Sequence, residues 1–223
     1  MKIVPAILSE NMEDFLLRLK QAESFTTYVQ IDIMDGIFVS SKSFPEEKIK
    51  GINTSLSFEI HLMVKDPLEF MSRIDNAHLK KVIFHFESDV NHFDFINHVE
   101  ERGMIAGMAI KPETKLEEFR EIAAHVNTLM FLTVDPCCYG NPFKPEVLKK
   151  IEKARRIFAD KTISADGGVS LENLESFLKM GLDYVCVGSR IFLNSSPEKS
   201  YNQFIKKIAE LESGKSGKIS EVK

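Results

Sequence analysis

Hydrophobic and polar positions follow two spacings that alternate along the whole chain. Short apolar runs, typical of buried strands, are separated by segments whose apolar residues recur every three or four positions, as in amphipathic helices. The predicted strands cover residues 3–8, 28–33, 57–63, 81–86, 104–110, 128–134, 162–165 and 184–187. The predicted helices cover residues 10–22, 44–52, 66–74, 90–101, 115–124, 145–158, 170–180 and 197–211.

Strict alternation of strands and helices predicts parallel strands joined by helical crossovers. Eight such units predict an α/β protein whose eight parallel strands form the core of a (β/α)8 TIM barrel. A doubly wound open sheet is the alternative, and its dinucleotide-binding form would carry a glycine-rich loop after the first strand. The chain has Ser9-Glu10-Asn11 at that point, which favours the barrel.

Local signals mark several helix ends. Pro67 follows Asp66 at a helix-compatible first position, and Ser170 and Gly181 are predicted as the cap and the stop of one helix. The chain from Ser213 is rich in glycine, serine and lysine. We therefore expect a single barrel domain over residues 1–212 and a flexible tail over residues 213–223.

Composition limits the classes of function. The 223 residues are 43% hydrophobic and 28% charged, which suits one globular domain. A net charge of −4 gives no support for nucleic-acid binding. We expect no signal peptide and no membrane partner, since no apolar run approaches the ~20 residues of a membrane span. The three cysteines do not suggest a disulfide framework, so we expect a cytoplasmic protein.

Polar residues cluster where the predicted strands end. In a barrel of this kind these ends form one rim, and the active site lies there. Packing alone gives core strands no reason to carry such residues at their ends. The rim residues are Ser9, Gln30, Asp32, His61, His85, Glu87, Lys111, Asp135, Asp166, Gly188 and Ser189.

Asp32, His61 and Asp166 could meet across the mouth of the barrel. Carboxylates and an imidazole suit zinc, iron or manganese. A hydrogen-bonded core histidine explains His61 equally well, and a strand-end carboxylate can simply cap a loop. Two acids on opposite sides of the mouth also suit removal of a proton from one face of a substrate and its return to the other.

Glycines after the seventh and eighth strands suggest a phosphate site. Gly167 and Gly168 lead into one helix, and Gly188 and Ser189 follow the last strand. Glycine lets the backbone approach a ligand, and these two loops form the usual phosphate site of barrel enzymes. Ordinary strand-to-helix turns are the alternative.

Six ordered motifs together resemble the ribulose-phosphate 3-epimerase family. The resemblance spans nearly the whole chain. The motifs are Pro5-Ala6-Ile7-Leu8-Ser9, Asp32-Ile33-Met34-Asp35-Gly36-Ile37-Phe38-Val39, His61-Leu62-Met63-Val64, Val134-Asp135-Pro136 with Gly140 and Pro142-Phe143, Asp166-Gly167-Gly168, and Gly188-Ser189-Arg190-Ile191-Phe192.

The resemblance implies a (β/α)8 enzyme that epimerises a small phosphorylated ketose at C3, works as a homo-oligomer and uses one divalent metal ion (Zn, Fe, Mn or Co). Asp32 and Asp166 would be the two acid/base groups. The implied metal ligands are Asp32, His61, Asp166 and Gln30. The implied substrate contacts are Ser9, His61, Gly140, Gly167, Gly168, Gly188 and Ser189.

Two departures from the family pattern bear on the chemistry. The family carries a histidine ligand two residues before the first aspartate, whereas this chain has Gln30, a weaker donor that should weaken metal binding. The family's Pro-Gly-Phe-Gly-Gly-Gln loop is replaced by Pro136-Cys137-Cys138-Tyr139-Gly140-Asn141, in which the cysteine pair fills the loop. Ser40-Ser41 also replaces a Pro-Asn pair.

Three functions therefore stay open at this point. The first is a pentulose-phosphate epimerase that interconverts D-ribulose 5-phosphate and D-xylulose 5-phosphate. The second is a hexulose-phosphate epimerase acting on a sugar such as allulose 6-phosphate. The third is a non-catalytic phosphosugar-binding protein, against which the presence of Asp32, His61 and Asp166 argues.

Overall fold

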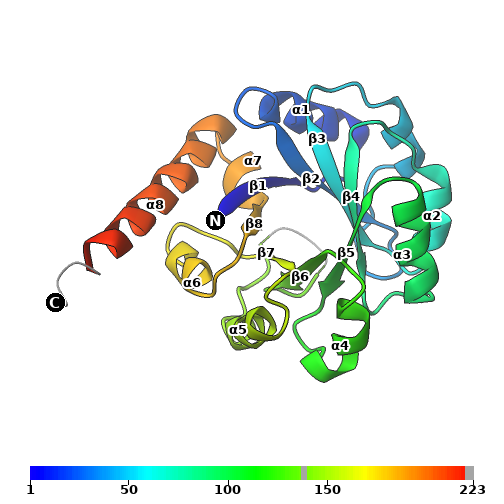
Figure 1. Cartoon of the computed structure of the whole chain (residues 1–223). Helices are drawn as coiled ribbons and strands as arrows, with labels where there is room; N and C mark the ends of the chain where they lie inside the picture. The colour runs from blue at the N-terminus through cyan, green and yellow to red at the C-terminus, as the bar shows by residue number, and fades with distance from the viewer. Residues whose placement is uncertain (137–139, 219–223) are drawn as a thin grey trace.

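The computed structural model describes residues 1–136 and 140–218. Within these ranges, eight parallel strands pair in sequence order, and β1 pairs with β8 to close the barrel. Helices surround the strands (Figure 1). The predicted (β/α)8 TIM barrel is confirmed.

The strands lie close to their predicted positions. Their bounds are β1 (Lys2–Ile7), β2 (Tyr28–Met34), β3 (Ser57–Met63), β4 (Leu79–His85), β5 (Ile105–Ile110), β6 (Thr128–Leu132), β7 (Thr162–Asp166) and β8 (Tyr184–Val187). Strand β6 ends two positions before the predicted end at Val134, and β7 includes Asp166.

The helices also follow the predicted order. Their bounds are α1 (Met12–Ala22), α2 (Pro67–Arg73), α3 (His92–Glu101), α4 (Leu116–Ala123), α5 (Val147–Ile157), α6 (Leu174–Lys179), α7 (Ser189–Phe192) and α8 (Pro197–Lys218), and Glu46–Gly51 form the 3-10 helix η1. The Asp66 carboxylate accepts hydrogen bonds from the backbone N–H groups of Leu68 and Glu69, which confirms the predicted start of α2.

The prediction that Ser170 caps a helix is wrong. Residues 171–173 form a turn, and α6 begins at Leu174 with Asn173 at the cap position. The Asn173 side chain accepts a hydrogen bond from the Ser170 N–H and donates one to the Gly168 carbonyl. These two bonds stabilise the turn and delay the start of the helix.

Helix α8 runs along the outside of the barrel and contacts β1, α1, α6 and α7 (Figure 1). It continues to Lys218, so the predicted helix end at Leu211 is wrong. The flexible tail over residues 213–223 stays a prediction, and residues 219–223 lie outside the described ranges. No helix in those ranges combines the length and apolar character needed to cross a membrane.

Alternating residues of each strand face two different environments. In β2, Val29, Ile31 and Ile33 are fully buried in the apolar layer that also holds core residues of the helices. Gln30 and Asp32 face the barrel interior instead, because side chains two apart on a strand share a face. The strand alternation therefore directs both polar groups into the barrel.

The amino-terminal end of the barrel interior holds a buried polar cluster. Glu59 of β3 pairs with Lys81 of β4, and their carboxylate oxygen and Nζ lie 3.1 Å apart. The hydroxyls of Tyr28 and Tyr184 each donate to the same carboxylate at 3.2 Å. This cluster fills the floor of the barrel below the rim.

Candidate active site

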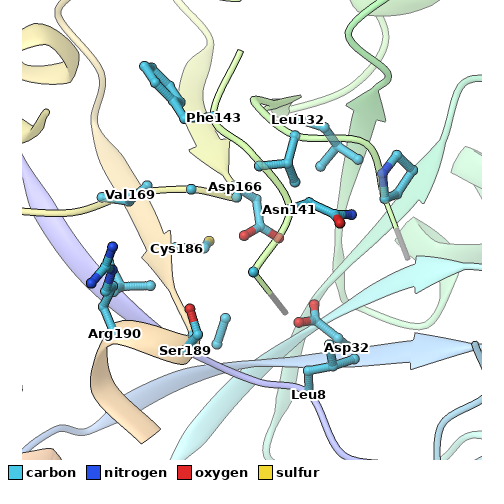
Figure 2. Close-up of a pocket in the computed structure, with 18 of the residues that line it drawn as sticks. Leu8, Asp32, Leu132, Asn141, Phe143, Asp166, Val169, Cys186, Ser189 and Arg190 are labelled. Atoms are coloured by element: carbon cyan, nitrogen blue, oxygen red, sulfur yellow. The ribbon is translucent and has the colours of Figure 1, made fainter. Parts of the chain in front are cut away.

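A cavity of about 390 Å³ opens among the carboxyl ends of the strands. Figure 2 shows Asp32 and Asp166 with their carboxylates directed into it from two different strands. The structure brings most of the predicted site residues to its wall. They are Asp32, His61, Gly140, Asp166, Gly167, Gly168, Gly188 and Ser189.

Barrel closure brings the two acids to one histidine. Asp32 and His61 lie opposite each other in the paired strands β2 and β3. Asp166 ends β7, which reaches β2 through β8 and β1. The His61 Nδ1 atom lies 3.2 Å from Asp32 Oδ1 and 3.3 Å from Asp166 Oδ2. The sequence prediction that these three residues meet is confirmed.

Gln30 lies between the two acids and is fully buried. Its Nε2 donates to Asp32 Oδ1 and to Asp166 Oδ2, both at 2.8 Å. Its Oε1 accepts a hydrogen bond from the Cys186 thiol at 3.0 Å. Carboxylates are acceptors, so the amide nitrogen must face them. The role of Gln30 as a metal ligand stays a prediction, and it requires the amide to rotate so that its oxygen faces the acids.

Asp32 and His61, at the floor of this cavity, shift each other's pKa. Burial, together with the neighbouring Asp166 carboxylate, raises the pKa of Asp32 to about 6. Burial alone would lower the pKa of His61, but its hydrogen bonds to Asp166 and Asp32 raise it to about 9. A protonated His61 therefore lies beside the carboxylates and offsets their charge.

The hydrogen bonds of His61 continue outward through β4. Its Nε2 lies 2.9 Å from His85 Nε2, and His85 Nδ1 lies 3.2 Å from Glu87 Oε2. The strand-end pattern placed His85 and Glu87 on the rim without a role. Two signals point to their link with His61: His85 ends the strand next to β3, and Glu87 lies two positions further on.

Burial also separates the charge states of this pair. It lowers the pKa of His85 to about 4. For Glu87, burial acts to raise the pKa, but hydrogen bonds from His85 and Thr114 lower it to about 2. This series of hydrogen bonds therefore links a charged His61 ring, a neutral His85 ring and an ionised Glu87 carboxylate.

The three residues at the cavity floor fit a divalent metal ion. Asp32, His61 and Asp166 each offer a ligand atom, and these atoms all lie within 4.8 Å of one another. Two carboxylates and an imidazole suit Zn, Fe, Mn or Co. A bound cation would take the place of the proton on His61 Nδ1, which lies beside the carboxylates of Asp32 and Asp166.

The fold itself requires the glycines at the end of β7. Gly167 has φ +99°, and a Cβ there would lie 2.4 Å from Val134 Cγ2. Gly168 has φ +64°, and a Cβ there would lie 3.0 Å from Phe143 Cβ. The predicted phosphate contacts of these glycines stay predictions.

Ser9 is buried, and its hydroxyl donates to the backbone oxygen of Asn11 at 2.8 Å. This bond places the hydroxyl at the start of α1. The predicted contact of Ser9 with a substrate stays a prediction. The predicted role of Cys137 and Cys138 in filling their loop lies outside the described residues.

Helix α7 was absent from the sequence prediction. It spans Ser189–Phe192 and is too short to show a helical repeat of apolar residues. Ser189 and Arg190 of its first turn both line the cavity (Figure 2). The glycine and serine after β8 were the available signal, and they marked the position without indicating a helix.

Comparison with solved structures supports the fold. The chain superposes on 3-hexulose-6-phosphate synthase from Salmonella typhimurium with a TM-score of 0.71, covering 95% of this chain and 100% of that one at 13% identity. A second 3-hexulose-6-phosphate synthase structure gives a TM-score of 0.69 over 93% of this chain and 99% of that chain, at 14% identity.

Comparison with curated sequences indicates the family. The chain is 28% identical to ribulose-phosphate 3-epimerase of Schizosaccharomyces pombe over 89% of its own length and 90% of the relative. It is also 28% identical to ribulose-phosphate 3-epimerase of Mycobacterium tuberculosis over 87% of each chain. The model of the ribulose-phosphate 3-epimerase family matches residues 2–192. With the barrel and the paired acids, this match shows that the chain belongs to the ribulose-phosphate 3-epimerase family.

Proposed function

We propose that this chain interconverts D-ribulose 5-phosphate and D-xylulose 5-phosphate by moving a proton at C3. The observation that carries the proposal is the pair of carboxylates, Asp32 and Asp166, held by one buried amide and one imidazole at the floor of the cavity. The curated relatives described above are named ribulose-phosphate 3-epimerase, which supports this substrate.

Epimerisation needs one group that removes the C3 proton and another that supplies a proton to the opposite face of the carbon. Asp32 and Asp166 extend from β2 and β7 into one cavity, so each can serve one face of a substrate held between them. Acid/base catalysis is most effective when the pKa of the group lies near the working pH. In the absence of a metal ion, burial raises the pKa of Asp32 to about 6.

Asp32, His61 and Asp166 would hold a divalent metal ion, with Gln30 as the fourth proposed ligand. When bound, the ion supplies positive charge that stabilises negative charge on the substrate oxygens after the C3 proton leaves. Without the ion, the His61 Nδ1 atom and the Gln30 amide nitrogen contact both carboxylates and hold them in place.

The substrate phosphate would lie against the loops after β7 and β8. Gly167, Gly168, Gly188 and Ser189 line that side of the cavity, as expected for the phosphate site of a barrel enzyme. Gly140 lines the cavity wall as well. We retain Ser9 as a further proposed substrate contact.

Proton exchange in D2O, followed by NMR, tests the proposal. The purified protein is offered ribulose 5-phosphate or allulose 6-phosphate separately, with Mn, Zn, Fe or Co added. We expect deuterium at C3 of ribulose 5-phosphate. Exchange only into allulose 6-phosphate would indicate a hexulose-phosphate epimerase. No exchange into either sugar would indicate a binding protein.

Substitution of either acid tests the two-acid mechanism. We expect Asp32→Asn and Asp166→Asn each to lower kcat by about 10²–10⁴, since each removes one proton-transfer group. Asp75→Asn is the matched control, because Asp75 is an exposed aspartate remote from the cavity. Near-full turnover by Asp166→Asn would overturn the mechanism.

A further inference from the structure

Two side chains outside the cavity wall extend the hydrogen bonding of His61. His85 and His61 lie on the neighbouring strands β4 and β3, and their Nε2 atoms are 2.9 Å apart. Both rings are buried. Glu87 follows β4 and contacts the other ring nitrogen of His85 at 3.2 Å. Because the two histidine rings are buried, water does not reach them, and these contacts satisfy their ring nitrogens.

We propose that His85 and Glu87 are positioning residues that fix the ring of His61, so that its Nδ1 faces Asp32 and Asp166 as a ligand nitrogen. Glu87 orients the His85 ring, and His85 accepts the hydrogen bond of His61 Nε2–H. The inference rests on the proposed function only in taking His61 as a metal ligand.

Glu87 is the fixed end of this chain. Its Oε1 accepts hydrogen bonds from the Lys111 backbone N–H, at 3.0 Å, and from the Thr114 hydroxyl. These two donors hold the carboxylate in one orientation and leave Oε2 for His85. A carboxylate can only accept, so the hydrogen of this contact belongs to His85 Nδ1.

His85 transmits that orientation to His61. The His85 ring is fully buried and packs against Phe38, with the two ring centroids 4.7 Å apart. A His61 ring whose Nδ1 binds a metal ion carries its hydrogen on Nε2, so the His85 Nε2 atom, 2.9 Å away, must accept that hydrogen. The hydrogen between the two Nε2 atoms therefore belongs to His61.

The consequence for His61 is a single useful orientation. With Nε2–H committed to His85, Nδ1 is the ring nitrogen that faces the acids, at 3.2 and 3.3 Å. A ring flipped by 180° would lose the contact with His85. Partners of this kind that orient a ligating histidine typically change metal affinity by 10–100-fold when they are removed.

Metal affinity is the first test, because it does not depend on turnover. Mn²⁺ binding to the metal-free protein is measured by titration for the wild type, His85→Leu, His85→Gln and Glu87→Gln. We expect His85→Leu to raise the Kd by about 10–100-fold. His85→Gln should lose less Mn²⁺ affinity, because the glutamine side-chain oxygen can take the place of the His85 Nε2 acceptor. Glu87→Gln should give an intermediate loss.

His92→Gln is the matched control. His92 lies at the start of α3 and its Nε2 contacts the Phe86 carbonyl at 2.8 Å, outside the chain from Glu87 to His61. We expect this variant to bind Mn²⁺ as the wild type does. A wild-type Kd in His85→Leu would overturn the inference while leaving the epimerase proposal intact.

A ¹⁵N-histidine NMR experiment on the metal-free protein gives a second readout. We expect a scalar coupling across the hydrogen bond between the two Nε2 atoms, with the proton attached to His61. His85→Leu should abolish this coupling and His92→Gln should keep it. A proton attached to His85 Nε2, or no coupling, would overturn the inference even if the wild type bound no metal.

Discussion

Gln30 bridges the two acids of the site. Its amide donates to both carboxylates, so it separates and orients them without adding charge. The Cys186 thiol donates to its oxygen and fixes the direction of the amide. The side chain thus acts in the structure as a hydrogen-bond donor to the acids.

Gln30→His should tighten metal binding. Imidazole is a stronger donor than an amide oxygen to zinc-like ions, so we expect the Kd for Zn²⁺ to fall by about tenfold or more. Calorimetric titration of the metal-free protein measures the change. Gln203→His, at an exposed position of α8, controls for an added histidine. Unchanged affinity in Gln30→His would mean that this position does not contact the ion.

Gly167 tests how tightly the end of β7 is packed. Its φ is +99°, and an added Cβ would lie only 2.4 Å from Val134 Cγ2. Gly167→Ala should therefore lower the free energy of unfolding by about 2–4 kcal/mol. Urea denaturation measures this change. Gly51→Ala is the control, because a Cβ there meets nothing within 4 Å. Equal stability of the two variants would contradict the packing argument.

The sequence pattern could place the acids but could not orient their neighbours. Asp32, His61 and Asp166 were predicted to meet because each ends or nearly ends a strand. The direction of the Gln30 amide depends on Cys186, which is distant in sequence and lies on β8, a strand that meets β1 only when the barrel closes. The link from His61 to His85 likewise depends on side-chain distances that spacing does not give.

At the scale of elements, β3 and β4 carry a buried ion pair at their amino-terminal ends. Glu59 and Lys81 lie directly opposite each other in the ladder, and the carboxylate is fully buried. A buried charge is tolerated when a charged partner and further hydrogen bonds satisfy it, and two tyrosine hydroxyls complete that set. The pair therefore helps to fix the register of the two strands.

Lys81→Met should destabilise the protein by about 3–5 kcal/mol, because it leaves the Glu59 charge buried without its cation. Guanidinium unfolding at pH 7 measures this loss. The double variant Glu59→Leu/Lys81→Met should recover much of the stability, since it removes both charges. A double variant as unstable as Lys81→Met would show that packing, rather than the unpaired charge, causes the loss.

Element prediction succeeded where a segment was long enough to show a period. Strand β3 has the predicted bounds, whereas the four residues of α7 could not be foreseen. The start of α6 was misplaced because two capping residues, Ser170 and Asn173, stand three positions apart. The choice between them depends on the contact of Asn173 with Gly168, which only the folded turn supplies.

At the scale of the whole molecule, His61 links stability to pH. Its pKa is raised to about 9 in the folded protein, against about 6.5 when unfolded. The stabilisation is therefore fully present below pH 6.5 and is lost as pH rises to 9. The shift corresponds to about 3 kcal/mol.

We expect metal-free protein to lose up to about that 3 kcal/mol of unfolding free energy between pH 6.5 and 9. Denaturation across this range with a chelator present measures the slope. His92→Gln should keep the slope and His61→Gln should lack it. If the unfolding free energy of the wild type did not change with pH, the ion pairs of His61 with Asp32 and Asp166 would be contradicted. Metal binding displaces the same proton, so metal affinity should rise over the same pH range.

The two acids lie far apart in the order of synthesis. Asp32 emerges early and Asp166 late, and the strand that carries Cys186 follows only after both. A chain that stops before β7 therefore has Asp32 but lacks the second acid. Such a fragment would lack one of the proposed metal ligands and one of the two proposed proton-transfer groups. We therefore expect chains truncated before β7 to have no epimerase activity.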